Sequence, residues 1–219
     1  IEDIRAGDTV TALQGADIGG TKVAACMEID PPEFVELRIE DGTILRLTVE
    51  HPVAVEKGVF RMAGALKPGD NVLKDAHGEP VPVRIQQTRR ITTGKTAFNL
   101  VVERGGTFVA NGIILHNKGC FFPDTPILMS DRSEKMISSL AAGDEVLAFR
   151  ADGSLVAAKI RNIIRYEVDE YYEVETDSVK IRVTAEHPFY VGDRTFRTID
   201  ALTAGIVIYA YDGSGLREQ

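Results

Sequence analysis

The neighbouring side chains of His116 and Asn117 form the first group in this sequence that could do chemistry. An asparagine side-chain nitrogen can attack its own backbone carbonyl, which cleaves the chain after that residue and leaves a C-terminal succinimide. A neighbouring imidazole can supply or remove the proton that this step requires. The bond concerned joins Asn117 to Lys118, although a His-Asn pair taken alone is more often a plain surface dipeptide.

A cysteine follows this pair closely, because Cys120 comes directly after Gly119 and opens an apolar stretch. A thiolate is a strong nucleophile, and attack by Cys120 on the carbonyl of Gly119 would convert the peptide bond into a thioester. A thioester is hydrolysed far more readily than an amide. The alternative for an arbitrary cysteine is a buried structural thiol, which is also what we expect of Cys26.

A Thr-x-x-His element occurs twice, as Thr48 to His51 and as Thr184 to His187. Residues three apart on a strand point to opposite faces, so a shared site requires a turn or bulge between threonine and histidine. Next to the peptide bond after Gly119, His187 could protonate the leaving nitrogen, and Thr184 could help to hold the strained peptide and its oxyanion. One such element means little, but these two stand in the same repeat frame.

The sequence repeats itself at a fixed offset. The matching segments are 4–10 with 140–146, 48–52 with 184–188, and 60–61 with 196–197. Each pair is 136 residues apart, since 140 minus 4, 184 minus 48 and 196 minus 60 all give 136. This period exceeds the roughly 20–50 residues of stacked repeats, so each copy is expected to be a domain in its own right.

We expect two incomplete copies. The first, residues 1–118, lacks its opening strand, and the second, residues 119–219, lacks its closing strands, as in a window cut from a longer tandem array. An alternative stays open, because residues 1–135 span about one full period and could close as a circular permutant. In that case Cys120 would meet the first Thr-x-x-His element rather than the second.

Alternating hydrophobic and polar residues predict short, half-buried strands. The clearest are 35–39 and 44–48, joined by an Asp-Gly turn, and 172–175 and 179–183 in the second copy. Helical pattern is confined to 198–202. The expected fold class is therefore all-β.

Composition argues against several classes of function. Lys and Arg total 25 against 33 Asp and Glu, a net charge of −8 without a basic run, so nucleic-acid binding is not expected. Two cysteines are too few for a disulfide framework and lack the spacing of a zinc site. No apolar run approaches the roughly 20 residues that cross a bilayer, and the first residues have no signal-peptide character, so we expect a soluble protein.

With these residues laid out, the sequence resembles the Hint superfamily, which comprises inteins, bacterial intein-like domains and Hedgehog autoprocessing domains. Residues 120–127 look like the opening segment of the family, and residues 108–117 look like its closing segment. The two Thr-x-x-His elements look like the corresponding element of the family. The resemblance covers nearly the whole chain.

The resemblance implies a horseshoe-shaped all-β fold whose first and last strands lie side by side. It also implies a single-turnover, intramolecular reaction without metal or cofactor, rather than a multiple-turnover enzyme; holding the reacting groups in one chain supplies effective molarities on the order of 10⁵ M. The catalytic residues implied are Cys120, Thr184, His187, His116 and Asn117, with Thr48 and His51 in the first copy, and Gly119 and Lys118 flank the bonds to be cut.

Three departures from the family pattern matter. Splicing inteins need Cys, Ser or Thr after the terminal asparagine, and Lys118 stands there, so cleavage is expected over splicing. Many members carry a histidine before the position of Phe108, where this chain has Gly105 and Gly106, and a frequent Asp is replaced by Asn99. The last two changes bear on the rate at which Asn117 cyclises.

The function expected is intein-like autocatalytic processing. Its partners would be flanking domains of the same polypeptide, in a larger secreted, toxin-like or phage-type protein, with no nucleic acid, membrane or small-molecule ligand. Two alternatives stay open. An inactive β scaffold or interaction module would be unaffected by loss of Cys120, and a cysteine hydrolase acting in trans would turn over an added peptide or ester.

Overall fold

The computed structural model of the protein describes residues 1–14, 17–29, 31, 33–92, 96–103, 106–117, 121–149, 154–161, 163, 165, 170–177, 179–185, 187–212 and 216–219. Lys118, Gly119 and Cys120 therefore lie outside the described residues.

The expected all-β fold class is confirmed. The described residues form strands, turns and three short 3-10 turns, and they contain no α-helix. The 3-10 turns are η1 (Ala63–Ala65), η2 (Ile137–Ser139) and η3 (Ile199–Ala201). The helical pattern at 198–202 is thus a single 3-10 turn, too short for the helix that its spacing favoured.

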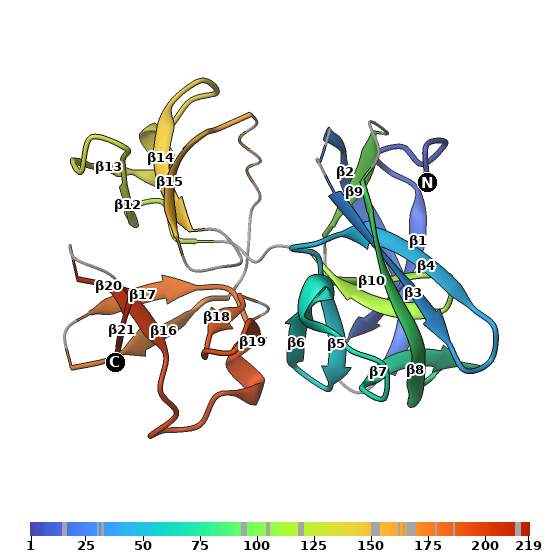
Figure 1. Ribbon diagram of the computed structural model, residues 1–219. Helices are drawn as coiled ribbons and strands as arrows, with labels where there is room; N and C mark the ends of the chain where they lie inside the picture. Colours follow the sequence, from blue (N-terminus) through green and yellow to red (C-terminus); the bar gives the residue numbers. More distant parts are fainter. Residues whose placement is uncertain are drawn as a thin grey trace.

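Two lobes make up the molecule (Figure 1). The strands of the first lobe are β1 (Thr9–Gln14), β2 (Asp17–Ile29), β3 (Glu33–Ile39), β4 (Ile44–Thr48), β5 (Pro52–Glu56), β6 (Val59–Met62), β7 (Asn71–Ala76), β8 (Glu79–Thr92), β9 (Ala97–Val102), β10 (Thr107–Ala110) and β11 (Ile113–His116). The strands of the second lobe are β12 (Pro126–Leu128), β13 (Glu134–Met136), β14 (Glu145–Phe149), β15 (Leu155–Lys159), β16 (Tyr172–Glu175), β17 (Lys180–Val183), β18 (Phe189–Tyr190), β19 (Thr195–Arg197), β20 (Tyr209–Tyr211) and β21 (Leu216–Glu218).

Sequence alternation accounts for these strands. Along β4, Leu45 and Leu47 are buried, whereas Ile44 and Arg46 face outward. The turn before β4 closes as expected, because Gly42 has a φ of 87°, which glycine adopts without strain.

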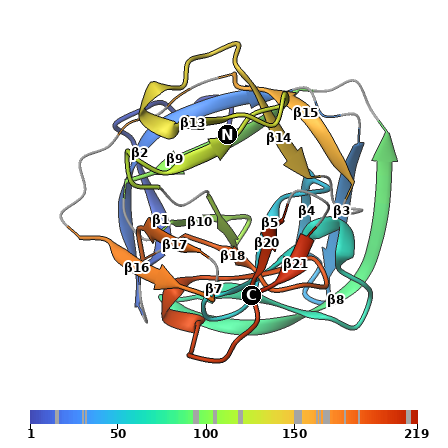
Figure 2. The same cartoon turned by 90° about the vertical axis from the view of Figure 1, so that its left-hand side faces the viewer.

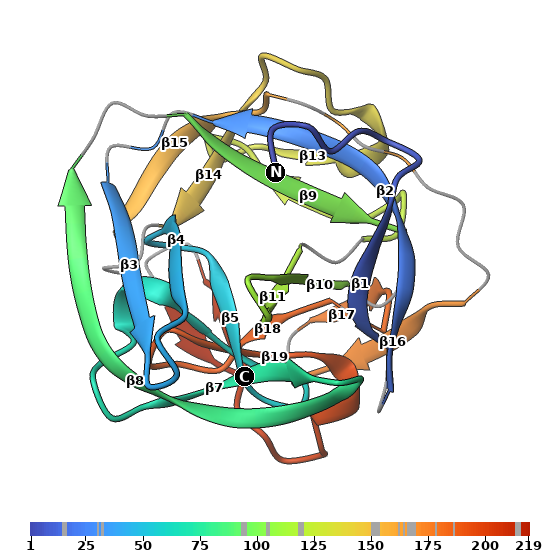
Figure 3. The ribbon, with the colours of Figure 1, turned by 90° about the vertical axis from the view of Figure 1, so that its right-hand side faces the viewer.

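A sheet of ten described strands runs through the first lobe and into the second. Its order is β18-β19-β6-β5-β11-β7-β8-β3-β4, with β10 paired to β11. A separate three-stranded sheet, β1-β2-β9, packs with it around the main core, which includes the buried Leu37, Ile85 and Ile113. Seen from the first lobe, the long strand β8 curves around the outside of this core beside β3 (Figure 3).

The second lobe consists largely of two-stranded pieces. The hairpins β12–β13 and β14–β15 lie in one half, and β16–β17, β18–β19 and β20–β21 lie in the other (Figures 1 and 2). The described strands of this lobe pair mostly within their own hairpins, so it is less extensively paired than the first lobe.

Candidate functional site

Both Thr-x-x-His elements contain the turn that their spacing required. The amide of His51 donates to the carbonyl of Thr48 at 3.1 Å, and the amide of His187 donates to that of Thr184 at 3.0 Å. The turn reverses the chain after β4 and after β17, so each histidine leaves the face that its strand position alone would dictate. The repeat in sequence is thereby a repeat in local structure.

The closing segment of the first lobe places His116 in the core. It ends strand β11, is 1% exposed, and packs edge-on against Phe60 of β6 with ring centroids 4.4 Å apart. On the neighbouring strand, Phe108 is buried and lies edge-on to His51, with centroids 6.0 Å apart. The two histidines thus contact different buried clusters, because Phe108 belongs to the main core and Phe60 to a second, smaller cluster.

Asn117 is 3% exposed and is held by the backbone on both sides of its amide. Its Nδ2 donates to the carbonyl of Gly106 at 2.5 Å, and its Oδ1 accepts from the amide of Val102 at 2.7 Å. The reverse orientation of the amide leaves only a 3.4 Å contact to the carbonyl of Val102, so we adopt the first. Its backbone amide also donates to Gly106, at 2.7 Å. The nitrogen that would attack therefore has a fixed position.

Thr107 anchors the strand that lies beside this amide. Its buried hydroxyl donates to the carbonyl of Leu13 at 3.0 Å and accepts from the amide of Leu13 at 2.8 Å. Because Thr107 is also the Cα partner of His116, these two bonds connect β1 to the end of the closing strand. The position of the His-Asn pair thus depends on the contact between Leu13 and Thr107, two residues that are 94 positions apart in sequence.

Burial makes His51 a neutral imidazole at pH 7. The residue keeps some exposed surface, but its Nε2 is enclosed and has no hydrogen-bond partner among the described residues. Desolvation of the charged ring lowers the pKa of His51 to about 4. This histidine is therefore uncharged at neutral pH and does not act there as an imidazolium acid.

The second site forms where the opening segment meets strand β17. Phe121 bridges Val183 in antiparallel fashion, and its ring lies 4.2 Å, between centroids, from that of His187. Val183, Thr184 and His187 are all buried. The residue that follows Cys120 is therefore docked beside the second Thr-x-x-His element.

Two further contacts hold the opening segment in this register. The amide of Phe122 donates to the carbonyl of Arg182 at 3.1 Å. The Arg182 guanidinium forms an ion pair with Asp124 and lies 4.0 Å above the centre of the Phe122 ring. Two neighbouring residues of the opening segment are thus bound to one arginine of β17.

The two sites are joined by a short stretch of chain. Three residues lie between Asn117 and Phe121, which makes four steps along the chain. Because a chain spans at most roughly 3.3–3.6 Å per step, the Cα atoms of Asn117 and Phe121 are at most about 14 Å apart. Both bonds considered for cleavage lie in this stretch. Each site thus adjoins one end of the same linker.

The structure gathers the predicted residues into two groups rather than one. His51, His116 and Asn117 lie in the first lobe, with Thr48 at the start of the His51 turn. Thr184 and His187 lie in the second lobe with the opening segment. Cys120, Gly119 and Lys118 lie outside the described residues. Phe121, the first described residue of the opening segment, bridges Val183 at the end of β17.

Sequence reasoning missed the contacts of several residues that shape these sites. Thr107, Gly106 and Val102 act through hydrogen bonds to the backbone or to Asn117, and no local pattern marks such contacts. Phe60 and Phe121 were visible, since one belongs to the repeat and the other follows Cys120, but their contacts to histidine rings required the fold.

The expectation for Cys26 is met only in part. This free cysteine is half-buried in β2 and packs against the main core.

Within the described ranges, no group of three or more His, Cys, Asp or Glu side chains could hold a metal ion. No helix in the described part of the chain is long and apolar enough to cross a membrane.

The chain was compared with protein-family models, with curated proteins and with solved structures. Residues 108–204 match the family model of the Hint module. Sonic hedgehog protein from Xenopus laevis is 29% identical over 113 residues, which is 47% of this chain and 26% of that protein. The chain thus aligns with about a quarter of the length of this curated relative.

Solved structures of inteins and of an intein-like domain align with about half of the chain. A bacterial intein-like domain from Clostridium thermocellum is 26% identical, with 53% of this chain and 86% of that domain covered and a TM-score of 0.47. The TvoVMA intein is 22% identical, with 51% and 71% covered and a TM-score of 0.47.

Proposed function

Since this chain carries a Hint module of the intein-like kind, we propose that it cleaves its own backbone in the linker between its two lobes. The observation that supports this most directly is the pair of sites at the ends of that linker. On one side the amide of Asn117 is fixed, and on the other Phe121 is docked against Val183 and His187. Each site supplies the residues of one half-reaction.

The first half-reaction is an N–S acyl shift at Cys120. Its thiolate attacks the carbonyl carbon of Gly119, a C–S bond forms, the C–N bond breaks, and the proton lost by the thiol is delivered to the leaving amine. Phe121 is the partner of Val183, and Thr184 and His187 follow in the chain, so His187 is the proton donor and Thr184 supports the oxyanion.

The second half-reaction is cyclisation of Asn117. Its Nδ2 attacks its own carbonyl carbon, the bond to Lys118 breaks, and the amine of Lys118 leaves with the proton from Nδ2. The hydrogen bond from Nδ2 to Gly106 draws that proton outward and makes the nitrogen a better nucleophile. His116, which directly precedes Asn117 in the sequence, transfers this proton from Nδ2 to the amine of Lys118.

Cleavage is the outcome rather than splicing. Lys118 follows Asn117, and an amine side chain does not take over the acyl group as a thiol or hydroxyl does. If both half-reactions run, and water or a thiol then attacks the thioester carbonyl and releases the Cys120 thiol, the chain is cut between the two lobes and the dipeptide Lys118-Gly119 is released. Domains that flank the chain would then belong to two different polypeptides.

The test is intact mass spectrometry of residues 1–219 with a small tagged domain at each end, incubated with and without dithiothreitol. We expect fragments that end at Gly119, grow with thiol and vanish in Cys120→Ala, and fragments that end at Asn117 and vanish in Asn117→Ala. A folded chain that stays intact in every condition would refute the proposal and would favour an inactive β scaffold.

A further inference from the structure

The two lobes are joined by strands that correspond to each other in the repeat. Strand β6 of the first lobe pairs antiparallel with β19 of the second, and Phe60 is the Cα partner of Phe196. These two residues are 136 positions apart, which is the period of the repeat. The flanking pairs are Arg61 with Thr195 and Val59 with Arg197.

This pairing has a local two-fold symmetry. Shifting the pair Val59–Arg197 by one period, forward for one partner and back for the other, gives Thr195 and Arg61, which is the other flanking pair. Each lobe thus presents the same strand to the other, in the manner of an isologous dimer interface, where one patch meets its own copy.

The hydrogen bonds at the two ends of the pairing follow the same symmetry. The amide of Thr198 donates to the carbonyl of Gly58 at 3.0 Å, and the amide of Met62 donates to the carbonyl of Arg194 at 3.1 Å. Thr198 stands one period after Met62, and Arg194 one period after Gly58. The two bonds are therefore one contact made twice.

From this symmetry we propose that the β5–β6 hairpin edge is a self-recognition surface of the module. Its partner is the same edge of another copy, and two modules bound in this way stay together after the chain between them is cut. The second part rests on the cleavage proposed above, whereas the surface itself does not. The lobes of this chain are then an internal dimer, and further copies in a longer array would pair by the same contact.

Packing supports a built interface rather than a chance contact of strands. Phe196 of the second lobe packs against the smaller buried cluster of the first, which contains Phe60, Ala54 and Ile114. Thr198 is 6% exposed at the end of the pairing. An edge strand has unpaired backbone N–H and C=O groups that can pair with another strand. Here the edge strand β6 pairs with β19, its equivalent in the repeat.

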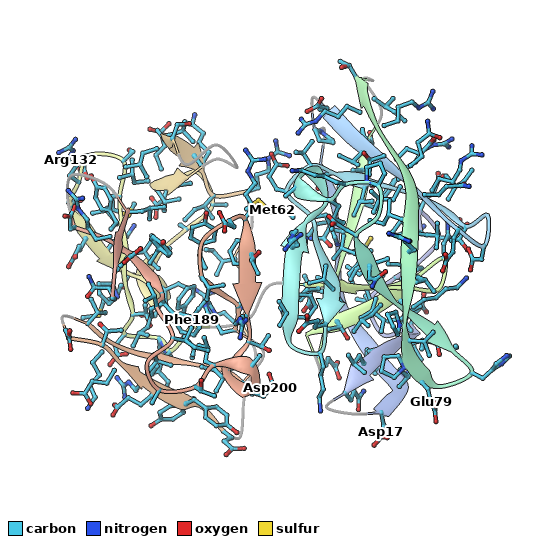
Figure 4. All side chains as sticks on the ribbon, turned by 60° about the horizontal axis from the view of Figure 1, so that its bottom comes forward. Asp17, Met62, Glu79, Arg132, Phe189 and Asp200 are labelled. Carbon is cyan, nitrogen blue, oxygen red and sulfur yellow. The ribbon has the colours of Figure 1, made fainter. Side chains whose placement is uncertain are left out.

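Gly58 allows the lobes to approach closely. A Cβ added at this position would lie 2.7 Å from the Cβ of Ala201 and 2.9 Å from the Oγ1 of Thr198, both in the second lobe. Figure 4 shows Met62 and Asp200 along the boundary between the lobes, whereas Glu79 lies at the far side of the first lobe. Glycine at position 58 is therefore an interface residue as well as a turn residue.

The experiment uses the full chain, folded and then cut by an added protease. Lys118 to Cys120 are replaced by a protease recognition sequence, which removes Cys120 and separates this test from that of the acyl shift. After cutting, we expect both fragments to elute together in gel filtration at the size of the uncut chain. Elution as two separate species would overturn the proposal.

A matched pair of glycine variants tests the surface itself. Gly58→Ala should weaken association of the cut fragments about tenfold or more. Gly42→Ala is the control, because Gly42 also has a positive φ, 87°, but an added Cβ meets nothing within 4 Å. Equal association in the two variants, with both folded by circular dichroism, would overturn the assignment of this surface.

A cross-link checks the register independently of stability. In an antiparallel ladder hydrogen-bonded pairs alternate with close pairs, and the bonds at Gly58 and Met62 make Arg61 and Thr195 a close pair, about 4.5 Å between Cα atoms. Arg61→Cys with Thr195→Cys should therefore form a disulfide that links the cut fragments. Cys26→Ala is used as background.

The diagonal pair Arg61→Cys with Arg197→Cys is the control for the cross-link. Its Cα atoms would be about 7–8 Å apart, beyond the reach of a disulfide. A link in the diagonal pair, or none in the direct pair, would show that the strands do not meet in the symmetric register.

Discussion

The ring of Phe121 lies against the ring of His187, with centroids 4.2 Å apart. This contact, together with the bridge from Phe121 to Val183, places Phe121 beside the second Thr-x-x-His element. The histidine of the first element contacts a different segment, because His51 lies beside Phe108 of the closing segment. The two histidines, although equivalent in the repeat, therefore have different neighbours.

Replacement of each histidine separates their roles. We expect His187→Ala to slow thiol-dependent cleavage after Gly119 by about 10²–10⁴-fold, because the leaving amine loses its proton donor. His51→Ala is the matched control and should leave that step unchanged. The rates are measured by mass spectrometry of a purified uncleaved chain after addition of dithiothreitol. Loss of cleavage in His51→Ala alone would mean that Cys120 uses the first lobe.

Thr107→Val should loosen the closing strand. The substitution keeps the shape of the side chain but removes both hydrogen bonds to Leu13, which leaves two buried backbone groups without partners at a cost of about 2–4 kcal/mol in unfolding free energy. Thr107→Ser keeps the hydroxyl and should cost about 1 kcal/mol, for a buried methyl group. Urea denaturation monitored by circular dichroism measures both. Equal losses would show that the hydroxyl does not anchor β10.

Much of the fold could be predicted from the sequence, because strand period and turn chemistry are local. The hairpin of 35–39 and 44–48 is present as β3 and β4, and the pairing of 172–175 with 180–183 is present as β16 and β17. What could not be predicted is the joining of β6 to β19. The sequence of an edge strand does not specify which other strand it pairs with, because that depends on how the two lobes are folded.

In the candidate site, too, the local features could be predicted from the sequence and the long-range contacts could not. The turn between Thr48 and His51 was required by the two-residue period of a strand and is present. The low pKa of His51 was not predictable, because it follows from enclosure of Nε2 by distant parts of the chain. The amide contacts of Asn117 likewise come from Gly106 and Val102, whose backbone groups carry no sequence signature.

Gly64→Ala should disturb the turn of the first Thr-x-x-His element. An added Cβ would overlap Cγ1 of Val49 and lie 3.2 Å from the Val49 carbonyl oxygen, and Val49 is the residue after Thr48. We expect a loss of about 1–3 kcal/mol in unfolding free energy. Gly19→Ala is the control, since Gly19 lies in β2 with nothing within 4 Å of an added Cβ, and alanine is favoured over glycine in a strand. Similar losses in both would argue against a steric cause.

His51 should make the protein less stable in weak acid. Its pKa is about 4 in the folded chain and about 6.5 when exposed, so between these values the unfolded chain binds a proton that the folded chain does not. The contribution of His51 to stability is therefore complete above pH 6.5 and is lost as the pH falls towards 4, by up to about 3 kcal/mol.

Urea denaturation at pH 7.5 and at pH 4.5 tests this pH dependence. In His51→Gln the loss of unfolding free energy between the two pH values should shrink, because the group that titrates is gone. His77→Asn is the matched control: His77 is an exposed turn residue with a φ of 59°, a conformation that asparagine accepts, and its removal should leave the loss unchanged. Carboxylates that titrate in this range contribute equally to all three proteins, so the difference between the variants reports on His51 alone. The same loss in His51→Gln as in the unmodified chain would show that His51 is not held neutral by burial.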